Sequence, residues 1–447
     1  MSFLPYPAYK DSGTEWLGGV PDHWIQTSIK HVVAINMGQS PSSDDCNIDG
    51  VGVPFLQGNG EFGLKYPTPR QYCPVARKIA DAGDLLFSVR APVGAINEAD
   101  QIYGIGRGLC AVKAGMKISK EFLWHFLSSS QSFLDSISTG STFEAVSAEQ
   151  VENITMALPR EIGEQTQITR FLDHETARID ALIEEQQRLI ELLKEKRQAV
   201  ISHAVTKGLD PTVPMKDSGV EWLGEVPAHW DVARVKNIAK LESGHTPSKE
   251  FPEYWEGGDI PWVSLNDSKQ LKVVDYIDET QFMITALGMN NSSARLLPAR
   301  AVVFTRDATI GLAAITTREM CVSQHLIAWI CNKALMLPEY LLLVFYAMEE
   351  ELGRFTFGAT LKTIGMPDVR KLTTTVPPLS EQAEVVAEVS SKRGLISRLI
   401  SEGENGIALL QERRSALISA AVTGKIDVRG WQPPASAPTP ELVQEAV

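Results

Sequence analysis

Hydrophobic residues recur at helical spacing over one long stretch of the chain. From about residue 164 to residue 205 there is no Gly or Pro, and apolar residues lie three, four or seven positions apart, as Ile168, Leu172 and Ile179 do. This spacing is typical of an amphipathic helix. Because an α-helix rises 1.5 Å per residue, roughly forty residues form a rod of about 60 Å, which is far longer than one small domain requires. We therefore expect this helix to pair with another.

A second helical stretch is predicted to run from Ser380 to Val422. Two prolines precede Ser380, which is a favourable N-cap residue. Three glycines lie within the stretch, and each costs about 1 kcal/mol relative to Ala inside a helix. The sequence therefore predicts a second long helix and leaves open whether it is kinked near residues 401–406.

Short apolar runs, broken by Gly and Pro, fill the region before each helical stretch. VPFLQG, DLLFSVR and LCAVKA precede the first, and IPWVSL, AVVFTR and LIAWIC precede the second in the same order. Such runs are typical of strands. One helix is also predicted in each region, near residues 121–134 and 338–352. The pattern indicates two mixed α/β domains.

The chain contains an internal repeat. KDSGTEWLGGVPDHW, at residues 10–24, returns as KDSGVEWLGEVPAHW at residues 216–230, with twelve of fifteen positions identical. The helical ends also match, LLKEKRQAVISHAVTKG from Leu192 with LLQERRSALISAAVTGK from Leu409. The chain is therefore two copies of one unit with divergent centres. We call residues 10–24 and 216–230 the latches, because their apolar side chains predict a strap that ties each domain to the helices.

Composition and charge narrow the class of protein. The 447 residues suffice for two or three domains, and no apolar run approaches the roughly 18 residues that span a bilayer, so we expect a cytoplasmic protein without a membrane contact. The five cysteines are odd in number and include no CxxC, which argues against a disulfide framework or a thiolate metal site. A formal charge of -13 argues against coating nucleic acid by bulk electrostatics. Any DNA contact must use local basic patches, or a partner must supply positive charge.

Motifs of enzymes are either absent from the sequence or in the wrong context. GNGEFG at residues 58–63 matches GxGxxG, but Pro67 and Pro69 prevent the helix that a dinucleotide site needs, so we interpret it as a turn. Arg178 stands where an HExxH motif beginning at His174 would place its second zinc ligand. The chain has no GxxxxGK[ST] and no Asn-Pro-Pro-aromatic or Asp-Pro-Pro-aromatic tetrapeptide. We therefore predict no catalytic activity.

Four polar or basic segments match between the divergent centres. GQSPS from Gly38 corresponds to GHTPS from Gly244, FSVR to FTRD, GRG to SQH, and GSTFE to GATLK. Gln, Arg, Lys and His can read base edges, while Ser and Thr hydroxyls suit phosphates. Each segment alone is more often a solvated turn, but their recurrence in both halves makes contact with DNA an equal alternative. The candidate DNA-binding residues are Gln39, Ser40, Arg90, Arg107, Thr142, His245, Thr246, Arg306, Gln324, His325, Thr360 and Lys362.

Together these features resemble a specificity subunit of type I restriction-modification systems. The signature is the repeated latch with two further segments, TKGLDPTVPMKDSG at residues 206–219 and ALISAAVTGKIDVRG at residues 416–430, and it covers essentially the whole chain. The resemblance implies an α+β fold in which two mixed α/β target recognition domains are joined by two long antiparallel, coiled-coil-like helices with an internal pseudo-twofold repeat. It also implies a two-part double-stranded DNA target.

The resemblance further implies partners that carry the chemistry. Two methyltransferase (M) subunits would dock on the helices, bind S-adenosylmethionine and methylate adenine at N6. Restriction/motor (R) subunits would use ATP and Mg. This chain itself would bind no cofactor or metal. A two-headed scaffold that binds protein rather than DNA remains an alternative, and a self-sufficient methyltransferase or nuclease is disfavoured by the absent motifs.

The predicted domains follow from the repeat and the resemblance. In order they are an N-terminal latch at 1–24, target recognition domain 1 at 25–158, a central long helix at 159–208, a linker with the repeated latch at 209–230, target recognition domain 2 at 231–376, a C-terminal long helix at 377–425, and a disordered tail at 426–447.

Exchange of one divergent centre tests whether the two domains read DNA independently. We expect that replacing residues 25–150 with the corresponding part of a relative changes one half of the methylated motif, because residues 231–370 are left intact. Methylation-aware sequencing of the host genome gives the motif. A change in both halves would refute independent recognition.

Overall fold

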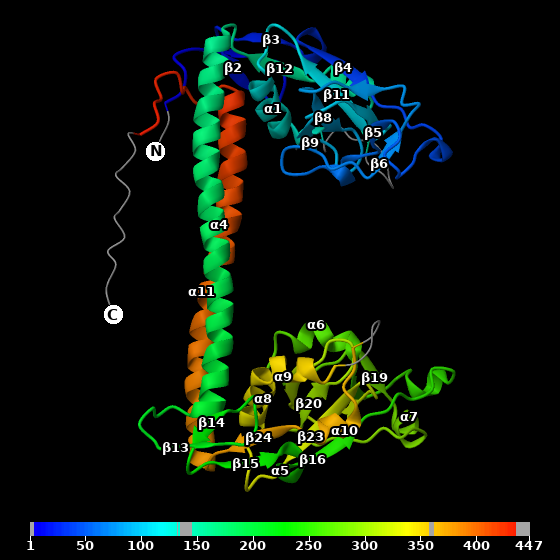
Figure 1. The fold of residues 1–447 in the computed structure, drawn as a ribbon, viewed down its shortest axis with the longest axis vertical. Helices are drawn as coiled ribbons and strands as arrows, with labels where there is room; N and C mark the ends of the chain where they lie inside the picture. Colours follow the sequence, from blue (N-terminus) through cyan, green and yellow to red (C-terminus); the bar gives the residue numbers. More distant parts are fainter. Residues whose placement is uncertain (1–3, 132, 135–144, 357–361, 435–447) are drawn as a thin grey trace. The chain divides into compact units, whose positions relative to one another are not determined.

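The computed structural model describes residues 4–131, 133–134, 145–356 and 362–434. The chain folds into two compact units (Figure 1). Unit 1 comprises Met1–Gln186 and Asn405–Val447, so it contains both ends of the chain, and unit 2 comprises Gln187–Glu404. None of the helices in these described ranges is long and apolar enough to cross a membrane.

Unit 1 is built around two four-stranded sheets. The first has the order β4-β11-β8-β9 and is antiparallel throughout, and the second has the order β6-β5-β10-β7 with a parallel β5–β10 pair. The strands are β4 (Val33–Met37), β5 (Val53–Leu56), β6 (Gln71–Cys73), β7 (Ile79–Ala80), β8 (Leu85–Ser88), β9 (Ile96–Glu98), β10 (Tyr103–Ile105) and β11 (Leu109–Ala114). Phe122 and Phe126 of helix α1 (Lys120–Ser129) pack on Phe87 of the first sheet in one buried cluster.

Unit 2 repeats this plan with a larger first sheet. Its five-stranded sheet has the order β16-β23-β20-β21-β18, and its three-stranded sheet has the order β19-β17-β22 with a parallel β17–β22 pair. The strands are β16 (Ala239–Ser243), β17 (Ile260–Val263), β18 (Tyr276–Ile277), β19 (Phe282–Ile284), β20 (Val302–Thr305), β21 (Ala313–Thr316), β22 (Cys321–Val322) and β23 (Leu326–Cys331). Helix α8 (Pro338–Ala347) covers this sheet through Phe345, which packs on Phe304 with ring centroids 4.9 Å apart.

Short elements complete both units. Each latch forms an antiparallel hairpin, and one further strand pair follows it, so the eight strands are β1 (Tyr9–Asp11) with β2 (Gly19–Pro21), β3 (Ile25–Ser28) with β12 (Thr155–Leu158), β13 (Met215–Asp217) with β14 (Glu225–Pro227), and β15 (Asp231–Arg234) with β24 (Thr373–Val376). The short helices are α3 (Ala148–Glu152), α5 (Val235–Ile238), α6 (Ser268–Leu271), α7 (Ala286–Asn290), α9 (Glu349–Arg354) and α10 (Met366–Val369). The short 3-10 helices are η1 (Ile29–His31), η2 (Ser43–Asp45), η3 (Asn59–Glu61), η4 (Pro252–Tyr254) and η5 (Leu265–Asp267).

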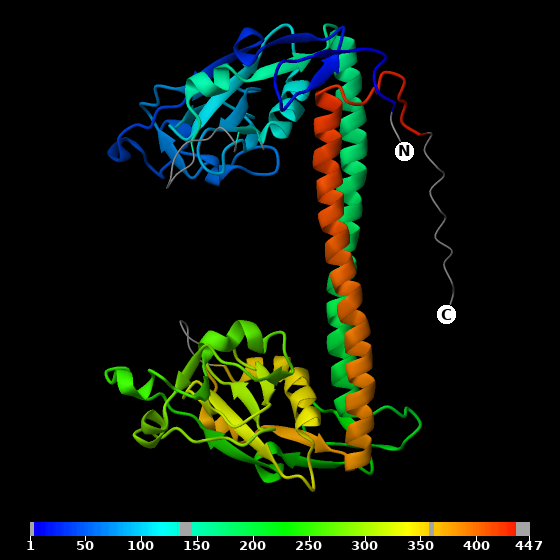
Figure 2. The ribbon, with the colours of Figure 1, turned by 180° about the vertical axis from the view of Figure 1, so that it is seen from behind.

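The two long helices are α4 (Ile162–Lys207) and α11 (Leu379–Val422). The helix of α11 continues through its three glycines, which answers the question of an interruption near residues 401–406. Within unit 1 the first part of α4 runs antiparallel to the last part of α11, and the two lie side by side in Figures 1 and 2. Phe171 and Ile418 belong to the same buried cluster, and Arg414 donates two hydrogen bonds to the Asp180 carboxylate at 2.8 and 3.2 Å. Within unit 2, Val205 of α4 and Val389 of α11 share the core.

The first turn of each long helix carries a Glu-Gln pair that holds the latch. In unit 1 the Trp24 indole N–H donates to Glu164 at 3.0 Å, and in unit 2 the Trp230 indole N–H donates to Glu381 at 2.7 Å. Both tryptophans are buried, as are Leu17 and Val20 of the first latch. The predicted apolar strap between domain and helix is therefore confirmed in each unit.

The glutamine of each pair holds the start of the domain helix. Gln165, which is fully buried, accepts from the Ser119 N–H at 2.8 Å and donates to the carbonyls of Lys117 and Pro159 at 3.0 Å. Ser119 is the N-cap of α1. Gln382 is equally buried and bonds in the same way to the segment before α8, where it accepts from the Leu337 N–H at 2.8 Å. One dipeptide thus fixes two elements in each unit.

Three sequence predictions need correction. The helix predicted over 121–134 is interrupted after α1 at Ser130, and residues 131, 133 and 134 are helical again. The helix predicted over 338–352 is two helices, because the chain turns at Met348 (φ −82°, ψ 6°). The predicted disorder of the tail is wrong for residues 426–431. Val428 is fully buried and the Trp431 ring packs edge-on against Phe171, with centroids 5.3 Å apart, because the core of unit 1 offers apolar surface there. The rest of the predicted tail, residues 435–447, lies outside the described residues.

Each long helix is followed by a glycine in the left-handed region. Gly208 after α4 has a φ of +77°, and Gly424 after α11 has a φ of +73°. A Cβ on Gly424 would lie 2.3 Å from Cδ of Pro21 and 3.2 Å from the Trp24 ring. Only glycine combines this backbone conformation with so close a contact to the latch.

Substitution of two glycines tests this account of the helix end. We expect Gly424→Ala to lower the free energy of unfolding by more than about 1 kcal/mol, through the positive φ and the clash with Pro21. Gly394→Ala is the control, because Gly394 lies inside α11 with open space around its Cα, and should raise that free energy by up to about 1 kcal/mol. Urea unfolding measures both. Equal stability of the two variants would contradict the proposed packing.

Candidate nucleic-acid interface

Two of the four matched segments meet in each unit. In unit 1 the Arg107 backbone N–H donates to the Ser40 hydroxyl at 3.2 Å, which joins the loop after β4 to the loop after β10. In unit 2 the Thr246 hydroxyl donates to the Gln324 side-chain carbonyl, which joins the loop after β16 to the loop after β22. Residues far apart in the sequence are therefore brought together at corresponding places in both copies.

Glycine makes this approach of the two loops possible. A Cβ on Gly38 would lie 2.1 Å from the Gly106 carbonyl oxygen, and a Cβ on Gly244 would lie 2.1 Å from the Val322 carbonyl oxygen. Both contacts are with backbone, so no side chain could yield. The first glycine of the GQSPS and GHTPS segments thus sets the distance between the loops that carry the candidate residues.

The remaining matched segments join the same region. Backbone bridges link Arg90 with Ala145 in unit 1 and Asp307 with Thr363 in unit 2. The Val89 N–H donates to the Gly108 carbonyl at 3.0 Å, and the Arg306 N–H donates to the His325 carbonyl at 3.0 Å. The second and third segments therefore adjoin in both units. Of the fourth, Thr142 and Thr360 lie outside the described residues.

The candidate side chains differ in how much solvent they meet. Gln39, Arg90, Arg107, His245, Gln324 and Lys362 are exposed, whereas Ser40, Thr246, Arg306 and His325 are half-buried. Arg306 is the least available of the arginines, because its Nε lies 3.6 Å from the Asp307 carboxylate. Arg107 makes no ion pair with the described residues. The exposed residues are the better placed for contact with a ligand.

A groove of about 750 Å³ opens beside Ser40 and Arg107 in unit 1. Its polar lining includes Asn47, Gln57 and Gln71, and Gln57 donates from Nε2 to the Ser40 hydroxyl at 2.9 Å. Amide and guanidinium groups are the ones that recognise base edges. Sequence comparison between the repeats missed these three residues because they have no matching partner in unit 2. The available signal was the position of Gln57 directly after the apolar run of β5.

Cys46 lies at the wall of this groove, and Cys73 is its neighbour. Asn47 pairs with Tyr72 in an antiparallel bridge, so Cys46 and Cys73 occupy the next position of the same register. Burial and the neighbouring Cys73 raise the pKa of the Cys46 thiol. Both cysteines are free. Cys46 contributes a neutral wall to the groove.

In unit 2 the polar residues form a continuous chain of hydrogen bonds. The buried Asp307 carboxylate lies 2.7 Å from Nδ1 of His325 and also accepts from the Thr363 hydroxyl. The Nε2 atoms of His325 and Gln324 are 3.2 Å apart. Thr246 then closes the chain at the Gln324 carbonyl. Three of the predicted residues are thus held by Asp307, which was not among the candidates.

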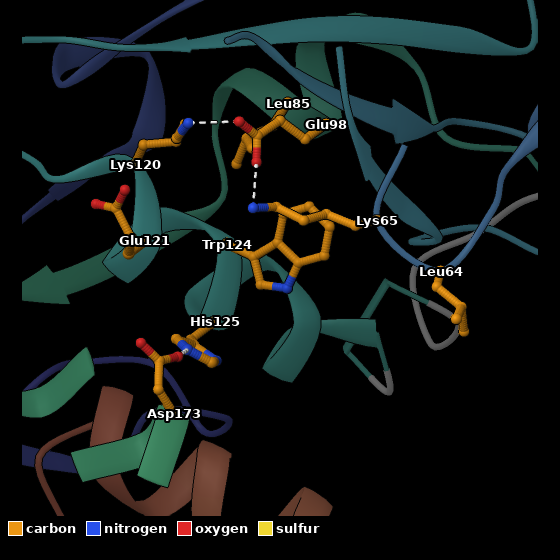
Figure 3. A pocket seen from close by; sticks show the side chains of 9 residues that line it. All are labelled: Leu64, Lys65, Leu85, Glu98, Lys120, Glu121, Trp124, His125 and Asp173. Carbon is orange, nitrogen blue, oxygen red and sulfur yellow. Dashed lines mark hydrogen bonds and ion pairs between the residues drawn. The ribbon is translucent and has the colours of Figure 1, made fainter. Parts of the chain in front are cut away.

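A second cavity of unit 1, of about 370 Å³, has none of the candidate residues in its lining. Figure 3 shows the side chains that line it. Lys120 and Lys65 both pair with the Glu98 carboxylate, at 2.6 and 3.6 Å, and His125 lies 3.2 Å from Asp173 of α4. Because the lining holds two lysines against the three carboxylates of Glu98, Glu121 and Asp173, the cavity lacks the local positive charge that a phosphate contact requires. We assign it to the packing of α1.

The chain matches the family described as type I restriction modification DNA specificity domain, over residues 21–193 and 227–391. The two matched segments cover most of the chain and include the candidate loops of each unit. The chain belongs to this family.

The GNGEFG segment, which was excluded as a dinucleotide motif and predicted as a turn, contains the short η3 helix.

Individual relatives agree with this assignment. The chain is 35% identical to the putative type I restriction enzyme MjaX specificity subunit of Methanocaldococcus jannaschii over 42% of its length, and this match spans 44% of that relative. It is 21% identical to the type I restriction enzyme EcoBI specificity subunit of Escherichia coli over 95% of its length and 90% of the relative. The fold is shared with a solved structure whose description concerns complex assembly and conformational transition of the type I R-M system. The TM-score is 0.70 and the identity 17%, and the match covers 91% of this chain and 99% of that one.

Alanine substitution of two arginines tests their contact with DNA. We expect Arg90→Ala and Arg306→Ala to weaken binding. A lost base contact costs about 1 to 3 kcal/mol and relaxes one base, while a lost phosphate contact lowers the salt slope by about one. The exposure of Arg90 and the Asp307 contact of Arg306 predict the larger effect for Arg90.

Binding to target duplex, measured at several salt concentrations, distinguishes these contacts. Arg318→Ala is the control, because Arg318 pairs with Asp278 in another loop of unit 2. Wild-type affinity and specificity in Arg90→Ala would show that Arg90 does not contact DNA.

Proposed function

We propose that this chain is the DNA sequence-specificity subunit of a type I restriction-modification complex and recognises a two-part DNA target. The observation that carries this proposal is the duplicated polar cluster, Ser40 with Arg107 in unit 1 and Thr246 with Gln324 in unit 2. Two clusters of different chemistry at equivalent places suit two half-sites of different sequence. The relatives are named as specificity subunits, and we assign this chain no catalytic step.

The long helices would serve as the spacer between the two recognition domains and as the docking site for two methyltransferase subunits. α4 and α11 each contribute residues to both units. Several leucines on them are exposed, and exposed apolar side chains on paired helices support docking of a partner. They are Leu182, Leu189, Leu192, Leu395, Leu399 and Leu409.

The charge of the chain supports a division of labour with these partners. At -13 the chain repels the DNA backbone overall, so partner subunits would bring basic surface around the duplex. In this proposal the methyltransferase subunits carry S-adenosylmethionine, and restriction subunits use ATP and Mg in the cytoplasm. This chain supplies sequence selection and the frame for assembly.

Purification with and without the methyltransferase tests the proposal. We expect tight, sequence-specific binding of duplex DNA only in the complex, and a split methylated motif with modified adenines on both strands in the host genome. A complex that binds other proteins but no specific duplex would instead identify a protein-binding scaffold. Methyl transfer by the purified chain alone would contradict a non-catalytic subunit.

An insertion into both helices tests their role as a spacer. The repeat boundary at Val205 is unsuitable, because the buried Val205 carbonyl accepts hydrogen bonds from Tyr340 at 3.2 Å and Thr375 at 2.7 Å. Four residues added after Gln186 and four after Glu404 lengthen each helix by roughly 6 Å. At about 3.4 Å per base pair this is close to two base pairs. We expect the unread spacer of the motif to grow by one or two base pairs with both half-sites unchanged.

Methylation-aware sequencing of a strain with the insertion gives the result. Insertion in one helix only is the control, because it breaks the pairing of α4 with α11 and should abolish methylation. An unchanged spacer in an active complex would show that the helices do not measure distance.

A further inference from the structure

Gln324 is the exposed end of a hydrogen-bond chain that starts at a buried carboxylate. The chain runs from Asp307 through His325 to Gln324 and ends at Thr246. The Asp307 side chain is 9% exposed and the His325 side chain is 37% exposed, so the chain leads from the protein interior to the surface. The residue after Asp307, Ala308, has a φ of +62°, which a non-glycine residue rarely adopts. The backbone is therefore held in an unfavourable conformation beside this chain.

The chemistry of the carboxylate fixes the direction of every bond. A carboxylate only accepts hydrogen bonds, so Nδ1 of His325 carries the proton that points to Asp307. The Gln324 amide nitrogen can only donate, so Nε2 of His325 accepts from it at 3.2 Å. At the other end, the Thr246 hydroxyl donates to the Gln324 carbonyl. The amide group of Gln324 is thereby oriented from both sides.

The oriented amide of Gln324 has one N–H and one oxygen lone pair that the hydrogen bonds to His325 and Thr246 do not use. These form an adjacent donor and acceptor on an exposed side chain. In the major groove adenine presents an N6 donor beside an N7 acceptor, which is the complementary pattern. Guanine presents two acceptors, and the Gln324 carbonyl cannot pair with the second.

We propose that Gln324 reads an adenine in the half-site bound by unit 2, and that Asp307 and His325 are positioning residues that hold its amide in the reading orientation. This inference rests on the proposed function of the chain. The corresponding hydrogen bonds cannot form in unit 1, because Arg90 and Gly108 stand where unit 2 has Asp307 and His325. Arg107 occupies the place of Gln324 there, so the two units present different groups from the same position.

The motif of Gln324 variants tests the assignment. In a strain that carries this chain and its methyltransferase, Gln324→Ala should make one adenine of the unit 2 half-site degenerate and leave the other positions unchanged. Gln324→Arg should shift that position towards guanine, because a guanidinium matches its two acceptors. The purified complexes are then compared on duplexes that carry the wild-type motif and on duplexes with one base replaced. We expect the Gln324→Ala complex to lose a discrimination of about 5- to 150-fold at that adenine alone.

His325→Phe tests the positioning role, because it keeps a ring of similar size and removes both nitrogens. We expect relaxation confined to the same adenine, together with a lower melting temperature because the buried Asp307 carboxylate loses its partner at Nδ1. A purely structural role would instead weaken recognition at all positions together. Gln281→Ala, an exposed glutamine in another loop of unit 2, is the matched control and should leave the motif intact.

The outcomes separate this inference from the proposed function. A wild-type strain without a split motif would overturn the function itself. A split motif that stays the same in Gln324→Ala, or that relaxes at a base other than adenine, would overturn only the assignment of Gln324. If the variant complex no longer methylates, equal loss of binding to all duplexes would likewise overturn it, and loss confined to one adenine would support it.

Discussion

The Glu-Gln pair in the first turn of each long helix is the contact on which both units depend. Glu164 accepts from the Trp24 indole and also from the Tyr6 hydroxyl at 2.9 Å. Burial, and then the Glu164 carboxylate, raise the pKa of Tyr6, so its hydroxyl stays a donor at physiological pH. Gln165 has no exposure to solvent, and each buried polar group left without a partner would cost about 1 to 3 kcal/mol. Latch, domain and helix are therefore fixed together at one place.

This frame explains why the centres of the two copies can diverge. The contacts of Glu164 and Glu381 are with latch residues and, for Glu164, with Tyr6. Those of Gln165 and Gln382 are with backbone atoms. Loop residues at the strand ends take no part in them. A change at Arg107 or Gln324 can therefore alter what a unit presents without disturbing what holds it. The contacts that hold the unit together are thus independent of the loop residues, because backbone partners are present whatever the side chain.

Local features of the fold could be predicted from the sequence. Helical spacing located α4 and α11 to within two residues at each end, and the repeated tryptophans located the buried straps. Antiparallel pairing of the two long helices was expected, but the unit that receives the end of α11 was not predicted, and it is unit 1. No residue pattern near Val422 records that choice, since apolar packing is non-directional.

In the candidate site, too, some residues could be predicted from the sequence and others could not. The matched segments identified Ser40, Arg107, Thr246 and Gln324, which the structure brings together in pairs. Gln57 and Asp307 were missed because each lies opposite a different residue type in the other copy. Asp307 in particular acts through its burial and its contact with His325, and neither property is visible in a single sequence.

The presence of both chain ends in unit 1 has a consequence for biosynthesis. Unit 2 is complete once residue 404 has left the ribosome, while unit 1 still lacks the segment that begins at Asn405. The first domain to be translated is therefore the last to be finished. Until then, the apolar surface that will receive Ile418, Val422 and Val428 is open to solvent. The nascent chain must carry that exposed surface through most of its synthesis, which makes the first unit the vulnerable one during translation.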